Sequence, residues 1–187
     1  MYRAIAAAAL LLLTANSSPV YRYALDQAGS EVTAKVAFFG LTSKTAGFPR
    51  MRGSIALSAD TPERIDLDVT LDARALTAPD KVTLERLRGP NFFDVARYPA
   101  ITFTGRTMTL TSARDATVDG EITARGVTRP ARLTVRFDTP PGEATGRAPI
   151  GLTATTTIDR RDFGMTAYPL IVGRNVTIRI RARMVPD

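Results

Sequence analysis

The sequence predicts an all-β domain in which amphipathic antiparallel strands either close into a barrel or stack as a sandwich. Apolar and polar residues alternate with a period of two along most of the chain, most strictly from Ile65 to Asp72. Turn-forming segments rich in Gly and Pro, such as residues 139–142, separate the alternating runs. The length of 187 residues corresponds to one domain. Its strands must therefore hide their apolar faces against one another.

The chain begins with a segment that we expect to be removed. Met1 to Arg3 is a short basic start, Ile5 to Leu13 is an apolar run, and Ala15 to Ser17 are small or polar residues at the spacing of a signal cleavage site. A nine-residue helix, at 1.5 Å per residue, spans only about half of a ~30 Å hydrocarbon layer. We therefore predict a signal peptide over residues 1–17 and a mature domain over residues 20–187, periplasmic or secreted in a bacterium.

About eight or nine strands follow from the alternation. In the last of them, Val176, Ile178 and Ile180 face one way and the arginines between them face the other. Eight strands close into a barrel that either fills with side chains or holds one slender ligand, and the pattern alone leaves both open. The expected strands cover residues 21–25, 32–38, 53–57, 65–72, 101–111, 118–124, 131–137, 150–158 and 176–184.

One segment departs from the β pattern. Val82, Leu84 and Leu87 follow helical spacing after Asp80, a plausible N-cap residue. Gly89 and Pro90 then stop the helix. The sequence predicts one short helix over residues 81–88.

The absence of Cys and His excludes several classes of site. The chain holds neither residue, so it cannot bind zinc or iron through thiolate or imidazole, form a disulfide, or use a Ser-His-Asp or Cys-His mechanism. We expect no cofactor, no metal site and no catalytic residues. A carboxylate-dependent enzyme is the least favoured alternative, because the arginines next to Asp159 and Asp162 would lower both pKa values instead of separating them.

The basic charge does not by itself indicate a nucleic-acid partner. The formal net charge is +7, but beyond the predicted signal peptide the arginines are spread from Arg22 to Arg183 and are not packed into one run. The densest stripe is Arg179, Arg181 and Arg183, which we interpret as a solvated strand face. We expect no nucleic acid as a partner, and at most transient contact with an anionic membrane surface.

Three ordered motifs resemble the YceI-like family. The first is GPNFFDV at residues 89–95, followed by Tyr98-Pro99 and residues 101–103. The second is DGEITARGVTRP at residues 119–130, and the third is IDRRDFGM at residues 158–165, with Gly173 and Val176 beyond it. Together with YALD at residues 23–26, the similarity covers essentially the whole mature chain.

The resemblance implies an exported, lipocalin-like antiparallel barrel whose pore takes an isoprenoid or a similar long-chain amphiphile. Family members often carry His near the positions of Gly29, Phe38 and Arg86, and an acidic residue near Arg174; this chain carries neither there. The departures imply a more apolar ligand or a differently held head group.

Candidate ligand-binding residues follow from the inward-facing apolar positions. Packing against one another is an equally weighted interpretation, because alternation identifies a buried face without showing what fills it. The pore-lining candidates are Val36, Phe38, Leu67, Val69, Leu71, Phe92, Phe93, Tyr98, Phe103, Phe163, Met165, Ile178 and Ile180, and the head-group candidates are Arg160, Arg161 and Arg174.

Two alternatives stay open. In an extended strand Asp159 and Arg161 would share a face and pair with each other, which we favour over head-group binding. A small outer-membrane or envelope structural barrel without a lumen ligand is a second interpretation of the same strands, although the aromatic content of 7% and the absence of Trp count against it. The oligomeric state is not determined, and an uncovered edge strand would allow a dimer.

Overall fold

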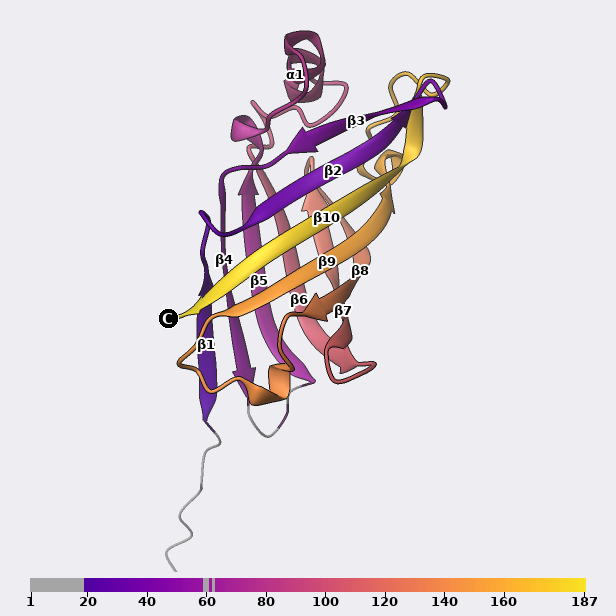
Figure 1. Cartoon of the computed structure of the whole chain (residues 1–187). Coiled ribbons are helices and arrows are strands. Elements are labelled where there is room, and N and C mark those ends of the chain that lie inside the picture. Colours follow the sequence, from indigo (N-terminus) through magenta and orange to yellow (C-terminus); the bar gives the residue numbers. More distant parts are fainter. Residues whose placement is uncertain (1–18, 59–60, 62) are drawn as a thin grey trace, which may run out of the picture.

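The computed structural model describes residues 19–58, 61 and 63–187, and the predicted signal peptide lies outside them. Ten strands, one α-helix and three short 3-10 helices make up the described part of the chain (Figure 1). The strands are β1 (Val20–Leu25), β2 (Glu31–Phe38), β3 (Thr42–Gly47), β4 (Met51–Ser58), β5 (Arg64–Asp72), β6 (Ala100–Leu110), β7 (Asp115–Ala124), β8 (Val127–Phe137), β9 (Ile150–Asp159) and β10 (Val172–Pro186); the helices are η1 (Ala73–Ala75), α1 (Lys81–Arg88), η2 (Pro141–Glu143) and η3 (Arg160–Phe163).

Eight of the strands close into an antiparallel barrel. The order around it is β1-β4-β5-β6-β7-β8-β9-β10, and the end of β10 pairs back onto β1 through Leu25 and Met184. This confirms the predicted barrel of about eight strands with one short α-helix. The long β10 also pairs with β2 along residues 172–181, so the β2–β3 hairpin extends the wall at one end of the barrel (Figure 1).

The sequence pattern did not predict β3. Its residues, TSKTAG, are small or polar and show no alternation of large apolar side chains. They form a strand because a tight turn at Phe39 and Gly40 folds them back along β2, where Phe38 pairs with Thr42 and Thr33 with Gly47. Tertiary pairing therefore overrides a weak local signal.

The two faces of the wall differ in polarity. On β5, Ile65 is 5% exposed and faces the interior, whereas Asp66 and Asp68 face outward and pair with Arg106 on β6. Further ion pairs on the outer face join Arg132 to Asp119, Arg136 to Asp115, Arg181 to Glu31 and Arg183 to Asp26. The strand alternation thus sorts charge to the outside and apolar side chains to the inside.

Gly120 on β7 permits a close approach of β6. A Cβ atom at this position would lie 2.1 Å from the carbonyl oxygen of Thr104 and 2.7 Å from the ring of Phe103. β6 has an irregular register here, between Gly105 and Thr107. Only glycine leaves room for both strands at this bulge.

Helix α1 lies across one end of the barrel and is held by its own cap. The Asp80 carboxylate accepts a 2.8 Å hydrogen bond from the Thr83 N–H and contacts Lys44 Nζ on β3, also at 2.8 Å. The predicted bounds of 81–88 are confirmed. No helix in the described residues is long and apolar enough to cross a bilayer.

Candidate functional site

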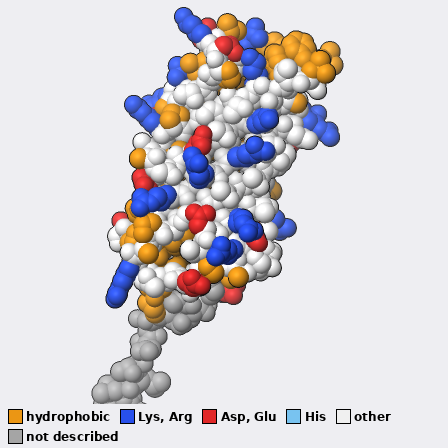
Figure 2. All heavy atoms as spheres, in the orientation of Figure 1, with side chains coloured by type: hydrophobic (Ala, Val, Ile, Leu, Met, Phe, Trp, Pro, Cys, Tyr) orange, Lys and Arg blue, Asp and Glu red, His pale blue; other side chains and the backbone are white. Residues whose placement is uncertain are grey.

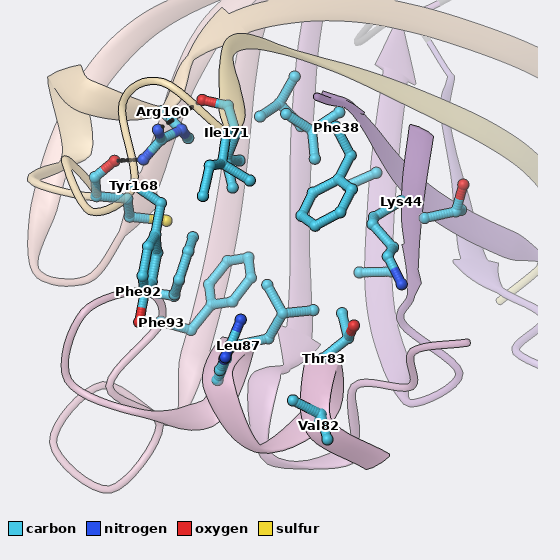
Figure 3. Close-up of a pocket in the computed structure, with 18 of the residues that line it drawn as sticks. Phe38, Lys44, Val82, Thr83, Leu87, Phe92, Phe93, Arg160, Tyr168 and Ile171 are labelled. Atoms are coloured by element: carbon cyan, nitrogen blue, oxygen red, sulfur yellow. Dashed lines mark hydrogen bonds between the residues drawn. The ribbon is translucent and has the colours of Figure 1, made fainter. Parts of the chain in front are cut away.

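A mostly apolar cavity opens where the β2–β3 hairpin, α1 and the segment of residues 165–172 meet. Its volume is about 460 Å³, within the range of ligand pockets. Phe38, Phe93 and Ile171 point into it from three different elements (Figure 3). The lining residues are Ala34, Val36, Phe38, Phe39, Lys44, Thr45, Ala46, Asp80, Val82, Thr83, Arg86, Leu87, Phe92, Phe93, Arg160, Met165, Tyr168, Ile171, Val172 and Val176. We call this the outer cavity.

Two smaller cavities continue inward from the outer cavity. The middle cavity has a volume of about 80 Å³ and the inner cavity about 150 Å³. Neighbouring cavities share walls, so the three follow one another along the barrel. The outer and middle cavities share Ala34, Phe93, Arg160, Met165 and Val176, and the middle and inner cavities share Val32, Leu71, Ile101, Ile122 and Ile178.

The barrel interior is therefore neither solidly packed nor one wide tunnel. Side chains such as Phe93 and Met165 stand between the outer and middle cavities. Methionine is unbranched and adapts readily to irregular neighbours. Residues that line two neighbouring cavities at once thus separate each cavity from the next.

Arg160 is a buried cation in the wall of this system. It is 3% exposed, and it donates to the backbone carbonyls of Gly173 at 2.9 Å, Val172 at 2.8 Å and Met165 (Figure 3). No carboxylate is among its hydrogen-bond partners in the described residues. Burial lowers the pKa of its guanidinium, although Asp159 partly offsets the shift; an arginine nevertheless stays charged. The outer cavity thus has one desolvated positive charge beside an apolar lining.

The other two head-group candidates lie elsewhere. Arg161 is exposed and forms a 2.5 Å ion pair with Asp159, whose pKa it holds at about 2 through its side chain and its backbone N–H. Arg174 is exposed near the start of β10 and lines none of the three cavities. Of the three arginines, only Arg160 reaches the cavity wall.

The local structure around Asp159 differs from the extended strand considered above. Residues 160–163 form the 3-10 helix η3, with the Asp159 side chain accepting from the Arg161 N–H as its cap. The helix turns Arg160 into the protein and leaves Arg161 outside. Asp159 and Arg161 still pair, as expected, but through the geometry of a cap.

The structure brings most of the pore-lining candidates to the cavities. Two exceptions lie outside them. Tyr98 packs beneath the turn at Gly126, and Phe163 fills the core where β8 and β9 diverge, since these strands pair only from Thr134 to Phe137. The outer cavity takes Val36, Phe38, Phe92, Phe93 and Met165, and the inner cavity takes Leu67, Val69, Leu71, Phe103, Ile178 and Ile180.

Several lining residues were absent from the sequence prediction. Ala34 and Val176 share the strand face of Val36 and Ile178, so the alternation contained the signal that would have found them. Val82, Tyr168 and Ile171 carry no such signal, because helix and loop residues reach the cavity only through tertiary packing. Lys44 lies on the unpredicted β3.

The polar groups at the mouth of the outer cavity are already paired. Lys44 and, to a smaller extent, Thr83 hold the pKa of Asp80 well below its usual value. Arg86 on α1 lies over the ring of Tyr168, 5.5 Å from its centroid. In the described part of the chain no cluster of three acidic residues is placed to hold a metal ion. The site is suited to enclosing an apolar chain.

Comparison with known proteins yields similarity over nearly the whole barrel. Residues 23–184 match the family model described as the YceI-like domain. A UPF0312 protein of Pseudomonas savastanoi pv. phaseolicola is 27% identical over 167 residues, covering 87% of each chain. Among solved structures, BcnA of Burkholderia cenocepacia superposes with a TM-score of 0.75 at 19% identity, covering 85% of this chain and 98% of that one.

A second solved structure is a polyisoprenoid binding domain from Saccharophagus degradans, implicated in plant cell wall breakdown. It superposes with a TM-score of 0.67 at 14% identity, covering 88% of this chain and 98% of that domain. At these identities, the solved structures show that the fold is shared.

Proposed function

The chain belongs to the YceI-like family, and from this premise we propose that it sequesters or transports an isoprenoid or a similar long-chain amphiphile in its barrel. One observation carries the proposal: an outer cavity of about 460 Å³ leads toward two further apolar cavities between the strands. A packed core leaves few voids larger than a water molecule. A series of neighbouring apolar cavities along the barrel fits a ligand that is long, thin and hydrophobic. The name of the Saccharophagus domain, a polyisoprenoid binding domain, agrees with this class of ligand.

The geometry suggests how the ligand would be oriented. The inner cavity is lined mostly by aliphatic and aromatic side chains from the barrel strands, so the apolar end of the ligand would lie there. Arg160 lies in the wall of the outer and middle cavities. Its guanidinium has five N–H donors. Each of its three nitrogens donates one hydrogen bond to a backbone carbonyl, which leaves two N–H groups for a ligand. A carbonyl or phosphate oxygen of the head group would therefore sit near Arg160, toward the mouth.

The polarity of the wall favours a lumen ligand over an outer-membrane barrel. A strand that faces lipid needs an apolar outer surface. Here the outer face of β5 and β6 carries the Arg106 ion pairs with Asp66 and Asp68.

Binding without catalysis also agrees with the carboxyl groups. A general acid needs a carboxyl whose pKa is raised toward neutrality. At Asp80 and Asp159 the neighbouring cations lower the pKa instead. The proposed mechanism is passive shielding of the chain from water.

We also propose that the protein works outside the cytoplasm. The support is the basic start and apolar run of the first 17 residues. Sequencing the N-terminus of protein recovered from its host would test this: a start close to residue 18 supports export, and an intact Met1 in a cytoplasmic fraction contradicts it.

Mass spectrometry of an organic extract tests the ligand proposal. The protein should be purified from the envelope of its own host without detergent, and its extract compared with that of an unrelated periplasmic protein treated identically. We expect a long-chain isoprenoid or related amphiphile at close to one molecule per chain. An extract that matches the control would refute the proposal.

A further inference from the structure

A cluster of exposed hydrophobic side chains surrounds the mouth of the outer cavity. Seven large hydrophobic residues are conspicuously exposed in the described part of the chain, and five of them lie here. Figure 2 shows hydrophobic atoms gathered at the upper right, where the β2–β3 turn and the loop before β10 lie in Figure 1. We define the apolar tip as Phe39 (60% exposed), Leu41 (92%), Val82 (57%), Tyr168 (40%) and Leu170 (95%).

The backbone holds the tip in this exposed form. Phe39 and Tyr168 have left-handed φ angles of 52° and 54°, which bulky side chains rarely adopt. The Phe39 N–H donates a 2.8 Å hydrogen bond to the Ile171 carbonyl and so joins the two turns. The side chains of both turns therefore project together from one end of the molecule.

The charge around the tip is positive. The segments that surround it, residues 36–46, 80–88 and 164–178, contain five basic residues (Lys44, Lys81, Arg86, Arg88 and Arg174) and two acidic ones (Asp80 and Glu85). The acidic groups of α1 are engaged: Asp80 contacts Lys44 at 2.8 Å, and Glu85 lies 3.9 Å from Lys81. An apolar tip flanked by cations is complementary to a bilayer that contains anionic lipid.

We propose that the apolar tip docks on the surface of an anionic lipid bilayer. A specific protein interface uses about 20–30 residues from each partner, far more than the five side chains of the tip. Shallow insertion of a few apolar side chains with cations at head-group level needs no such area.

Docking in this orientation would set the cavity mouth against the membrane. Phe39, Val82 and Tyr168 belong both to the tip and to the lining of the outer cavity. A lipid chain could then pass between bilayer and barrel without crossing open water. This transfer route rests on the proposed function, whereas docking itself does not.

Vesicle binding by matched leucine variants tests the proposal. The probes are phosphatidylcholine vesicles with and without phosphatidylglycerol. The full sequence is expressed, and the purified product is used. Leu41 and Leu170 would be replaced together by Ser; the control is Leu110→Ser, an exposed leucine (44%) at the far end of β6. We expect binding of wild type to the anionic vesicles, a loss of about tenfold per tip leucine, and no loss in the control.

A site-specific label gives a second readout. Because the chain has no cysteine, Leu170→Cys and Leu110→Cys can each carry a single polarity-sensitive dye. The dye at residue 170 should shift to the blue on adding anionic vesicles, and the dye at residue 110 should not.

Three results would overturn docking: no vesicle binding by wild type, undiminished binding by the double variant, or equal dye shifts at both positions. A wild-type dimer in sedimentation, abolished by the double variant without any vesicle binding, would assign the tip to a second copy of the chain instead. Lipid bound to the purified double variant, measured by mass spectrometry, separates the two proposals, since loss of docking leaves the cavity intact.

Discussion

Replacing Ala34 by Phe would place a phenyl ring in the wall between the outer and middle cavities. Ala34 lines both of them. A cavity of about 150 Å³ accommodates a benzene molecule, whereas the middle cavity has only about 80 Å³. The added ring would therefore block the passage toward the inner cavity. Ala37→Phe is the matched control, because Ala37 lies on the outward face of the same strand and is exposed.

The inner cavity determines the size of the effect. At about 30 Å³ for each water-sized group, its volume of about 150 Å³ holds about five methylene-sized groups. Burial of each such group contributes about 0.8 kcal/mol, which gives about 4 kcal/mol in total. Ordering of the bound chain offsets part of this gain. We expect the affinity for a long chain to fall about 100-fold.

A chain-length series measures this effect. Displacement of a fluorescent apolar probe by geraniol, farnesol and geranylgeraniol would give a dissociation constant for each alcohol. Affinity should rise along the series for wild type and Ala37→Phe, and should level off early for Ala34→Phe. Thermal unfolding monitored by circular dichroism would verify that both variants fold. If the folded Ala34→Phe variant kept the full chain-length dependence, the inner cavity could not be part of the binding path.

Three further predictions concern stability, each measured by urea unfolding. Arg160→Met removes the buried guanidinium that donates to three backbone carbonyls, and it should lower the free energy of unfolding by about 3 kcal/mol. The exposed control Arg161→Met should lower it much less, because solvent screens its ion pair; equal losses would show that the buried hydrogen bonds of Arg160 do not stabilise the fold. Because the pKa of Asp159 is lowered to about 2, its ion pair stabilises the fold above about pH 4 and loses this contribution as the pH falls toward 2. The stability difference between wild type and Asp159→Asn should shrink across that window, and a constant difference would count against the pair. Gly120→Ala should destabilise by more than about 2 kcal/mol through overpacking, while Gly142→Ala, which meets nothing within 4 Å, should be nearly neutral; similar values for the two would rule out the proposed crowding.

Sequence pattern predicted those elements whose signal is local. Helix α1 was predicted to its bounds because Asp80 and Gly89 are cap signals within a few residues of it. The alternation of β5 predicted which of its faces is buried. β3 was missed because its small residues owe their conformation to pairing with β2, which no local pattern records.

The same distinction between local and tertiary signals applies to the residues of the candidate site. Strand residues such as Val36 and Phe38 could be assigned to an inward face from their period of two. The position of Arg160 could not, because it depends on the turn of η3, which buries Arg160 and leaves Arg161 exposed. Tyr98 and Phe163 belong to sequence motifs that also supply cavity residues, but their own side chains pack outside the cavities.

By itself, the sequence determined that this chain forms amphipathic strands with one short helix and has no Cys or His for metal or nucleophilic chemistry. Those properties follow from residue identity and short-range periodicity. Only the tertiary structure decided that the apolar faces enclose cavities, that Arg160 faces them, and that five exposed hydrophobic residues meet at their mouth. Cavities and clusters arise from the distance between elements remote in the chain, and a one-dimensional pattern does not contain that distance.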